Sequence, residues 1–68
     1  MEKLTERQDE VLKFIKRFIK INGYSPTRQE IADAFDIHTN GAQHHINALA
    51  KKEAITVTPK ISRSIVVL

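Results

Sequence analysis

Residues 26–52, PTRQEIADAFDIHTNGAQHHINALAKK, contain two helical patterns separated by a short turn. The first pattern predicts a helix over about 27–35, because Thr27 and Glu30 have the spacing of a capping box. Its inner stripe consists of apolar residues at helical spacing, namely Ile31, Ala32 and Phe35. Asp36 follows, and Asp tolerates the left-handed backbone conformation that a tight turn needs. We therefore expect a short helix that ends in a tight turn.

The second pattern predicts a helix over about 40–52, with either Thr39 or Asn40 as its N-cap. Its apolar residues share one side: Ala42, Ile46, Leu49 and Ala50. The residues expected on its outer side are small or polar: Gly41, Gln43, His44 and Asn47. Two helices joined by a tight turn, the second with a polar outer face, are typical of a helix-turn-helix.

The residues before this pair predict another helix, over about 5–22. Thr5 and Gln8 have capping-box spacing, and Gly23 is the residue type that most often ends a helix in the left-handed conformation. Apolar residues recur between these signals at helical spacing, so one side of this helix should face a core.

After Glu53 the hydrophobic period changes from 3.6 to 2, which predicts a hairpin over about 55–68 with its loop at 59–63. A two-stranded ribbon is marginal alone, so it should pack on the helices, and residues 24–26 could add a short third strand. The expected fold class is mainly α with a small β hairpin. It is a three-helix winged helix-turn-helix, forming one domain over 1–68.

Composition excludes several classes of function. A chain of 68 residues with no Cys has no disulfide or thiolate zinc site, and it lacks the apolar run of about 20 residues that spans a bilayer. Three His are present, at positions 38, 44 and 45, but adjacent residues on a helix point about 100° apart, so no metal site is expected. Ser62 and Ser64 have no adjacent base for nucleophilic catalysis. We expect no enzyme activity, cofactor, membrane contact or small-molecule ligand.

The net charge of +3 is confined to one half of the chain. Residues 1–36 carry seven basic and seven acidic side chains, whereas residues 37–68 carry four basic and one acidic. A local excess of this kind favours an anionic partner such as a phosphate backbone. The alternatives are a chance imbalance on a solvated surface, or an acidic protein bound by a winged-helix interaction module.

The outer side of the third helix has the chemistry to read base edges in double-stranded DNA, because Asn and Gln pair bidentately with adenine and His donates to guanine. The candidate base-reading residues are Asn40, Gly41, Gln43, His44 and Asn47. Backbone N–H groups at the start of that helix, together with nearby cations, suit phosphate. The candidate phosphate residues are Arg28, Thr39, Lys51, Lys52, Lys60 and Arg63.

Three segments carry a resemblance to a known family. They are LTERQDEVLKFI at 4–15, GYSPTRQEIA at 23–32 and ALAKK at 48–52. Together they resemble the N-terminal DNA-binding domain of the LexA repressors over nearly the whole chain. The Ser62-Arg63 pair in the wing loop is similar to that family as well, which adds Ser62 to the candidate phosphate residues.

The resemblance implies a repressor domain that binds a palindromic operator half-site as a homodimer, in the cytoplasm of a bacterium and associated with its nucleoid. It also implies a C-terminal self-cleaving domain, absent here, that supplies most dimer contacts. We expect either a fragment of such a protein or a stand-alone minimal repressor, acting in the SOS response or in a phage or mobile-element circuit.

This chain departs from the family pattern in three places. Asp36 stands where Gly is usual, and the following turn is one residue shorter than in enterobacterial relatives. Gln43 and His44 replace two acidic residues common in the third helix. A different operator sequence is therefore expected.

Overall fold

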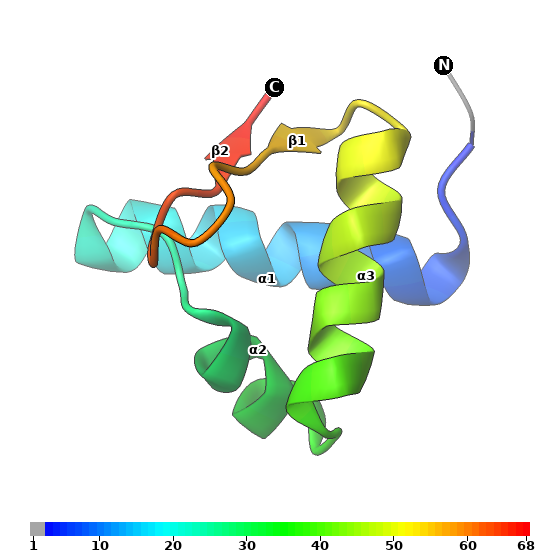
Figure 1. Cartoon of the computed structure of the whole chain (residues 1–68), viewed down its shortest axis with the longest axis horizontal. Coiled ribbons are helices and arrows are strands. Elements are labelled where there is room, and N and C mark those ends of the chain that lie inside the picture. The colour runs from blue at the N-terminus through cyan, green and yellow to red at the C-terminus, as the bar shows by residue number, and fades with distance from the viewer. Residues whose placement is uncertain (1–2) are drawn as a thin grey trace.

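The computed structural model describes residues 3–68 and has three helices followed by a two-stranded antiparallel sheet (Figure 1). The helices are α1 (Glu6–Asn22), α2 (Arg28–Phe35) and α3 (Thr39–Lys51). The strands are β1 (Ile55–Thr56) and β2 (Val66–Val67). Helix α3 packs against both other helices, and the strands with their loop form a wing beside it. The predicted winged helix-turn-helix is confirmed.

The first two helices begin as their local sequence predicts. Thr5 accepts a hydrogen bond from the Gln8 backbone N–H at 3.2 Å, and the Gln8 side chain accepts one from the Thr5 N–H at 3.1 Å. Thr27 and Glu30 form the same reciprocal pair at the start of α2. Helix α1 ends at Gly23, whose φ of 82° is left-handed. Each of these signals is local, which is why the sequence alone identifies them.

The tight turns use left-handed residues other than glycine. Asp36 has φ 53°, as expected, and the Ile37 N–H that follows it donates to the carbonyl of Ala32. After α3, Glu53 has φ 62°, and the next N–H, that of Ala54, donates to the carbonyl of Leu49. In both turns a backbone N–H thus donates to the carbonyl five residues earlier, which satisfies a carbonyl left unpaired at the helix end.

Helix α3 starts one residue earlier than predicted, and the expected cap by Thr39 or Asn40 is wrong. His38 is the N-cap, with extended backbone angles, and its carbonyl accepts from the Ala42 N–H at 3.1 Å. Among the described residues, the His38 side chain makes no capping hydrogen bond to α3. The error arose because side-chain preference was used to locate a helix start that backbone geometry determines here.

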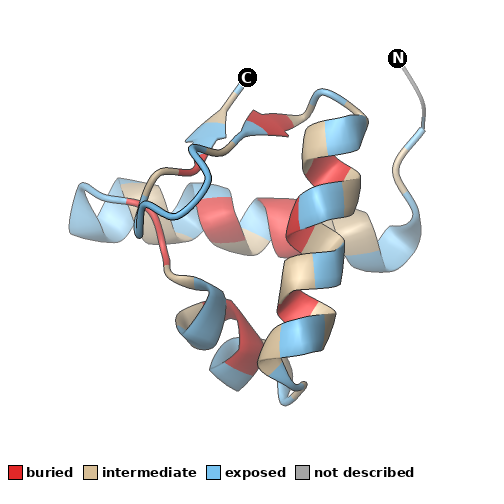
Figure 2. Cartoon of the chain, viewed as in Figure 1, coloured by how far each residue is buried: buried red, intermediate tan, exposed pale blue. Residues whose placement is uncertain are grey.

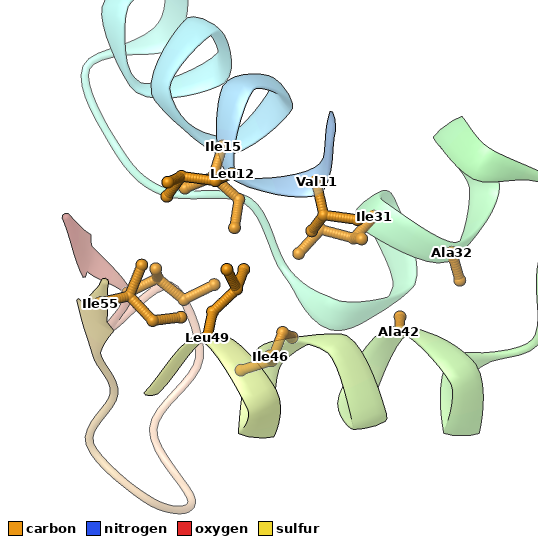
Figure 3. Close-up of a cluster of buried hydrophobic side chains, with 10 residues drawn as sticks. Val11, Leu12, Ile15, Ile31, Ala32, Ala42, Ile46, Leu49 and Ile55 are labelled. Atoms are coloured by element: carbon orange, nitrogen blue, oxygen red, sulfur yellow. The ribbon is translucent and has the colours of Figure 1, made fainter. Parts of the chain in front are cut away.

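The core lies where the three helices and the wing meet (Figures 2 and 3). Its buried residues are Val11, Leu12, Ile15, Ile31, Ala32, Ala42, Ile46, Leu49, Ile55 and Ile65. Three come from α1, two from α2 and three from α3, so α3 is fixed along its whole length. Burying a large aliphatic side chain stabilises by about 1.5–3 kcal/mol, so this set holds the face of α3 opposite the core toward solvent.

The strands of the wing are shorter than expected. Only Ile55–Val67 and Thr56–Val66 pair as strand residues, because the Thr58 N–H donates to the Ser64 Oγ instead of to a partner strand. Within residues 3–68, the sheet has two strands, so the possible third strand at 24–26 is not formed. Ile55 and Ile65 are buried, and Val57 and Val67 are partly buried against the core. None of the helices described is long and apolar enough to cross a membrane.

His45 lies at the edge of this core. Its Nδ1 is buried and, within residues 3–68, has no hydrogen-bond partner. Burial lowers the pKa of His45 below its usual 6.5, and the nearby charges of His44 and Arg7 lower it further. The folded state therefore favours the neutral imidazole.

The two glycines allow a paired test of the backbone. Gly23→Ala should destabilise the chain by about 1 kcal/mol, because a Cβ at φ 82° is strained although no atom lies within 4 Å of it. Gly41→Ala should stabilise it by up to about 1 kcal/mol, because alanine favours a helix and its Cβ would meet Ile37 at an ordinary 3.5 Å. Urea unfolding of both variants measures this, and equal shifts would contradict it.

His45 should make stability depend on pH. Since the folded pKa is lowered from 6.5, the unfolded chain takes up the proton first, and the free energy of unfolding should fall as the pH drops below about 6.5. Urea midpoints at about pH 7.5 and 5.5 should differ less in His45→Gln than in the wild type. His38→Gln, at an exposed position, is the matched control and should keep the wild-type dependence. An unchanged dependence in His45→Gln would exclude this role.

Candidate nucleic-acid interface

A groove of about 450 Å³ runs between the N-terminus of α2, one side of α3 and the wing loop. Half of the twelve predicted contact residues line it: Arg28, Thr39, Gln43, Lys60, Ser62 and Arg63. They come from three separate segments of the chain, which the helix-turn-helix and the hairpin bring together. A smaller hollow of about 230 Å³ continues along α3 and includes Asn47.

The other predicted residues of α3 lie on its outer face or its flank. Asn40, His44 and Asn47 are exposed, and their spacing of four and three places them along one line of the helix. Lys51 is exposed near the end of the same line. Gly41 is half-buried, and a Cβ there would point to Ile37 in the turn, so this glycine lies on the flank of the helix.

One hydrogen bond joins α2 to α3, and a second continues from it along α3. The Nη1 of Arg28 donates to the Oε1 of Gln43 at 3.3 Å, and the Nε2 of Gln43 donates to the Oδ1 of Asn47 at 2.8 Å. Each end of the Gln43 amide therefore has a partner, which restricts the side chain before any ligand arrives. A restrained amide loses less entropy when it binds.

The N-terminus of α3 is electrostatically different from those of α1 and α2. Those two helices have capping boxes and acidic residues in their first turns. Among the described residues, α3 has neither a side-chain cap nor an acidic first turn. Its first N–H groups and the positive end of its dipole are therefore available to an anion, beside Thr39 in the groove.

Arg63 is exposed, but its guanidinium is held by intramolecular contacts, which its predicted phosphate role did not anticipate. Its Nη1 and Nη2 donate to the two carboxylate oxygens of Glu30 at 2.9 and 3.2 Å. The Nη1 also donates to the carbonyl of Ser25 at 3.0 Å, and the guanidinium lies 4.5 Å from the ring centroid of Tyr24. The pKa of Glu30 is lowered, first by the backbone N–H of Thr27 and then by Arg63.

Lys52 also has intramolecular partners. Its Nζ donates to the Oε1 of Gln8 at 2.6 Å and to the carbonyl of Lys3 at 3.0 Å. It therefore ties the end of α3 to the start of α1, while Lys60 and Ser62 are exposed on the wing loop.

Three residues that shape the site had no sequence signal for this role. Ser25 is buried, and its Oγ accepts from the Ile65 N–H at 3.2 Å. The Ser64 hydroxyl lies within hydrogen-bond distance of the carbonyls of Thr58 and Ile61, at 3.0 and 2.9 Å, and closes the wing loop by donating to either one. Tyr24 supports the Arg63 guanidinium. All three act through partners that local pattern does not specify.

Comparison with known proteins supplies the family. Residues 1–64 match the LexA DNA binding domain. A LexA repressor of Thermosipho melanesiensis is 54% identical over 65 residues, which are 96% of this chain and 33% of that protein. LexA repressors of Pseudomonas chlororaphis and Ectopseudomonas mendocina are each 53% identical over 66 residues, or 96% of this chain and 33% and 32% of theirs.

The chain spans about a third of the length of these curated relatives. The family match covers α1, α2, α3 and most of the wing, and it includes all the residues that line the groove except Ile65. The resemblance expected from the sequence motifs is confirmed, and the chain belongs to the LexA DNA-binding domain family.

Proposed function

We propose that this domain reads one half of a palindromic operator, with α3 in the major groove of double-stranded DNA and the wing on the phosphate backbone. Two copies would act together as a bacterial transcriptional repressor, on the nucleoid in the cytoplasm. The observation that carries this proposal is the groove where α2, α3 and the wing bring candidate base and phosphate residues together.

Base reading is assigned to the polar face of α3. Asn40, Gln43, His44 and Asn47 present amides and an imidazole on the side of the helix opposite its buried residues. The bond from Arg28 to Gln43 orients the Gln43 amide on the groove side of this face. Gly41 is left out of this set, because it lies on the flank of α3 and a Cβ there would face Ile37 in the turn.

Phosphate binding is assigned to the exposed cations around that face and to the start of α3. Arg28 lies at the N-terminus of α2, Lys51 near the end of α3 and Lys60 on the wing, and all three are exposed. Thr39 and Ser62 contribute hydroxyl groups to the groove. Such contacts set position and affinity, whereas the polar face of α3 sets sequence preference.

We expect two copies of the domain to bind one operator, because one copy can make only a small number of contacts with DNA. A single domain would hold one half-site weakly, and half-sites about 34 Å apart, one turn of DNA, would let two copies bind one face. We therefore expect the preferred duplex to contain an inverted repeat.

Selection of duplexes from a random pool, followed by fluorescence anisotropy in rising salt, tests the proposal. Recovery of an inverted repeat with saturable binding is expected. Absence of saturable duplex binding at low salt would reject it and favour an acidic protein partner for the same surface.

Gln43→Ala should mainly relax base preference. Removing a bidentate contact of about 1–3 kcal/mol should lower the ratio of affinities for selected and random duplexes about tenfold, with little change on the random duplex. Anisotropy titrations on both duplexes measure the ratio. An equal loss on the two would contradict a base-reading role for Gln43.

Lys60→Ala should instead weaken binding to all duplexes by the same factor. The slope of log affinity against log salt should become shallower by about 0.9, because one phosphate contact is lost. Lys20→Ala removes the same charge from the exposed side of α1 and is the matched control, expected to leave the slope unchanged. Equal changes in the two variants would show that only total charge matters.

A further inference from the structure

We propose that Arg63 is a positioning residue: it fixes the wing against the start of α2, so that Lys60 and Ser62 meet the DNA backbone, and it does not itself bind phosphate. This inference rests on the proposed function and deepens it. It reassigns the cation that the sequence places most conspicuously in the wing.

The geometry of the Arg63 contact is that of a clamp. The guanidinium pairs as a fork with both oxygens of Glu30 and also reaches the carbonyl of Ser25. Planar two-point pairing fixes orientation as well as distance, which a lysine ammonium cannot do. The partners lie 33 and 38 residues away in the chain, so the clamp joins the wing to the helical body.

The wing has few other attachments. Its ribbon consists of two residue pairs, and the tip around Lys60 and Ile61 is exposed. A second bond close to the clamp, from the Ile65 N–H to the Ser25 Oγ, ends on the same residue. Two attachments to Ser25, separated by one residue along the wing, fix the direction in which the loop leaves the body.

Aromatic packing makes the receiving surface rigid. The guanidinium lies over Tyr24, and that ring packs on Phe18 with centroids 5.9 Å apart. Phe18 packs in turn on Phe14 at 5.9 Å, and Phe14 on Phe35 of α2 at 5.6 Å. The clamp thus rests on a row of four rings that runs along α1 to α2.

The charges argue against a phosphate role for this residue. Arg63 and Glu30 form a neutral pair, so together they add no net attraction for DNA. Turning the guanidinium toward a phosphate would leave the Glu30 carboxylate, whose side chain is 36% exposed, beside the groove with its charge uncompensated. Holding the pair together is therefore the arrangement that favours an anionic ligand.

Glu30→Gln distinguishes a positioning role of Arg63 from a phosphate-binding role, because the two roles predict opposite changes in affinity for DNA. The amide keeps the capping box of α2, which uses Glu or Gln, but it removes the charge that holds Arg63. It also raises the net charge by one, which alone would strengthen binding. If Arg63 positions the wing, affinity for a selected duplex of about 20 base pairs should fall about three- to tenfold despite the added charge.

The double variant completes the cycle. Arg63→Gln should lower the affinity for the selected duplex by a similar factor. The double variant Glu30→Gln/Arg63→Gln should lower it no more than either single variant, because the two substitutions remove the same contact. Arg63→Lys keeps the positive charge but cannot pair with both carboxylate oxygens, so its affinity for the duplex should fall as far as that of Arg63→Gln. Amide relaxation by NMR should show increased motion at residues 60–62 in these variants, with α3 unchanged.

Urea unfolding checks that each variant is folded before its affinity is compared. If Arg63→Gln does not fold, the affinity of Arg63→Lys tests the inference in its place. A rise in affinity for Glu30→Gln, additive effects in the double variant, or near wild-type affinity in Arg63→Lys would each overturn the inference. Those outcomes leave duplex binding by the wild type intact. Loss of wild-type binding would instead reject the proposed function.

Discussion

The shape of the interface depends on how the wing is attached to the helices. Ser25 accepts the Ile65 N–H through its hydroxyl and the Arg63 guanidinium through its carbonyl, and Glu30 holds the same guanidinium from α2. A ribbon of two residue pairs would otherwise be free to swing on the buried side chains of Ile55 and Ile65. The junction therefore fixes the position of the wing loop, which forms one wall of the groove beside α3.

Helix α3 is fixed by a different kind of interaction. Ala42, Ile46 and Leu49 are buried against the other two helices, and hydrophobic burial sets the rotation of the helix about its axis. That rotation directs Asn40, His44 and Asn47 outward together. The recognition face is thus a consequence of the core, whereas the wing is placed by polar contacts. A change in a core residue should therefore disturb the recognition face of α3. A change at Ser25 or Glu30 should instead disturb the position of the wing.

The fold was predictable where its signals are local, and the site only in part. The capping boxes at Thr5 and Thr27 and the left-handed turns at Gly23 and Asp36 depend on residues a few positions apart, and the sequence identifies them. The partners of Arg63 and Lys52 lie 33 to 49 residues away, so no pattern indicates them. The sequence does not indicate His38 as the N-cap of α3, because its side chain makes no capping hydrogen bond.

Counting cations therefore overstates the electrostatic strength of the binding surface. Four basic residues lie in the second half of the chain, but Arg63 is neutralised by Glu30, and Lys52 is directed to the start of α1. Lys51, Lys60 and Arg28 of α2 are left for the proposed phosphate contacts, which would correspond to a salt slope of only about −3 per copy. One copy would be released readily at physiological salt, whereas two copies on one duplex would double the slope. The small number of free cations around α3 would thus be a physical reason for the proposed binding of two copies to one operator.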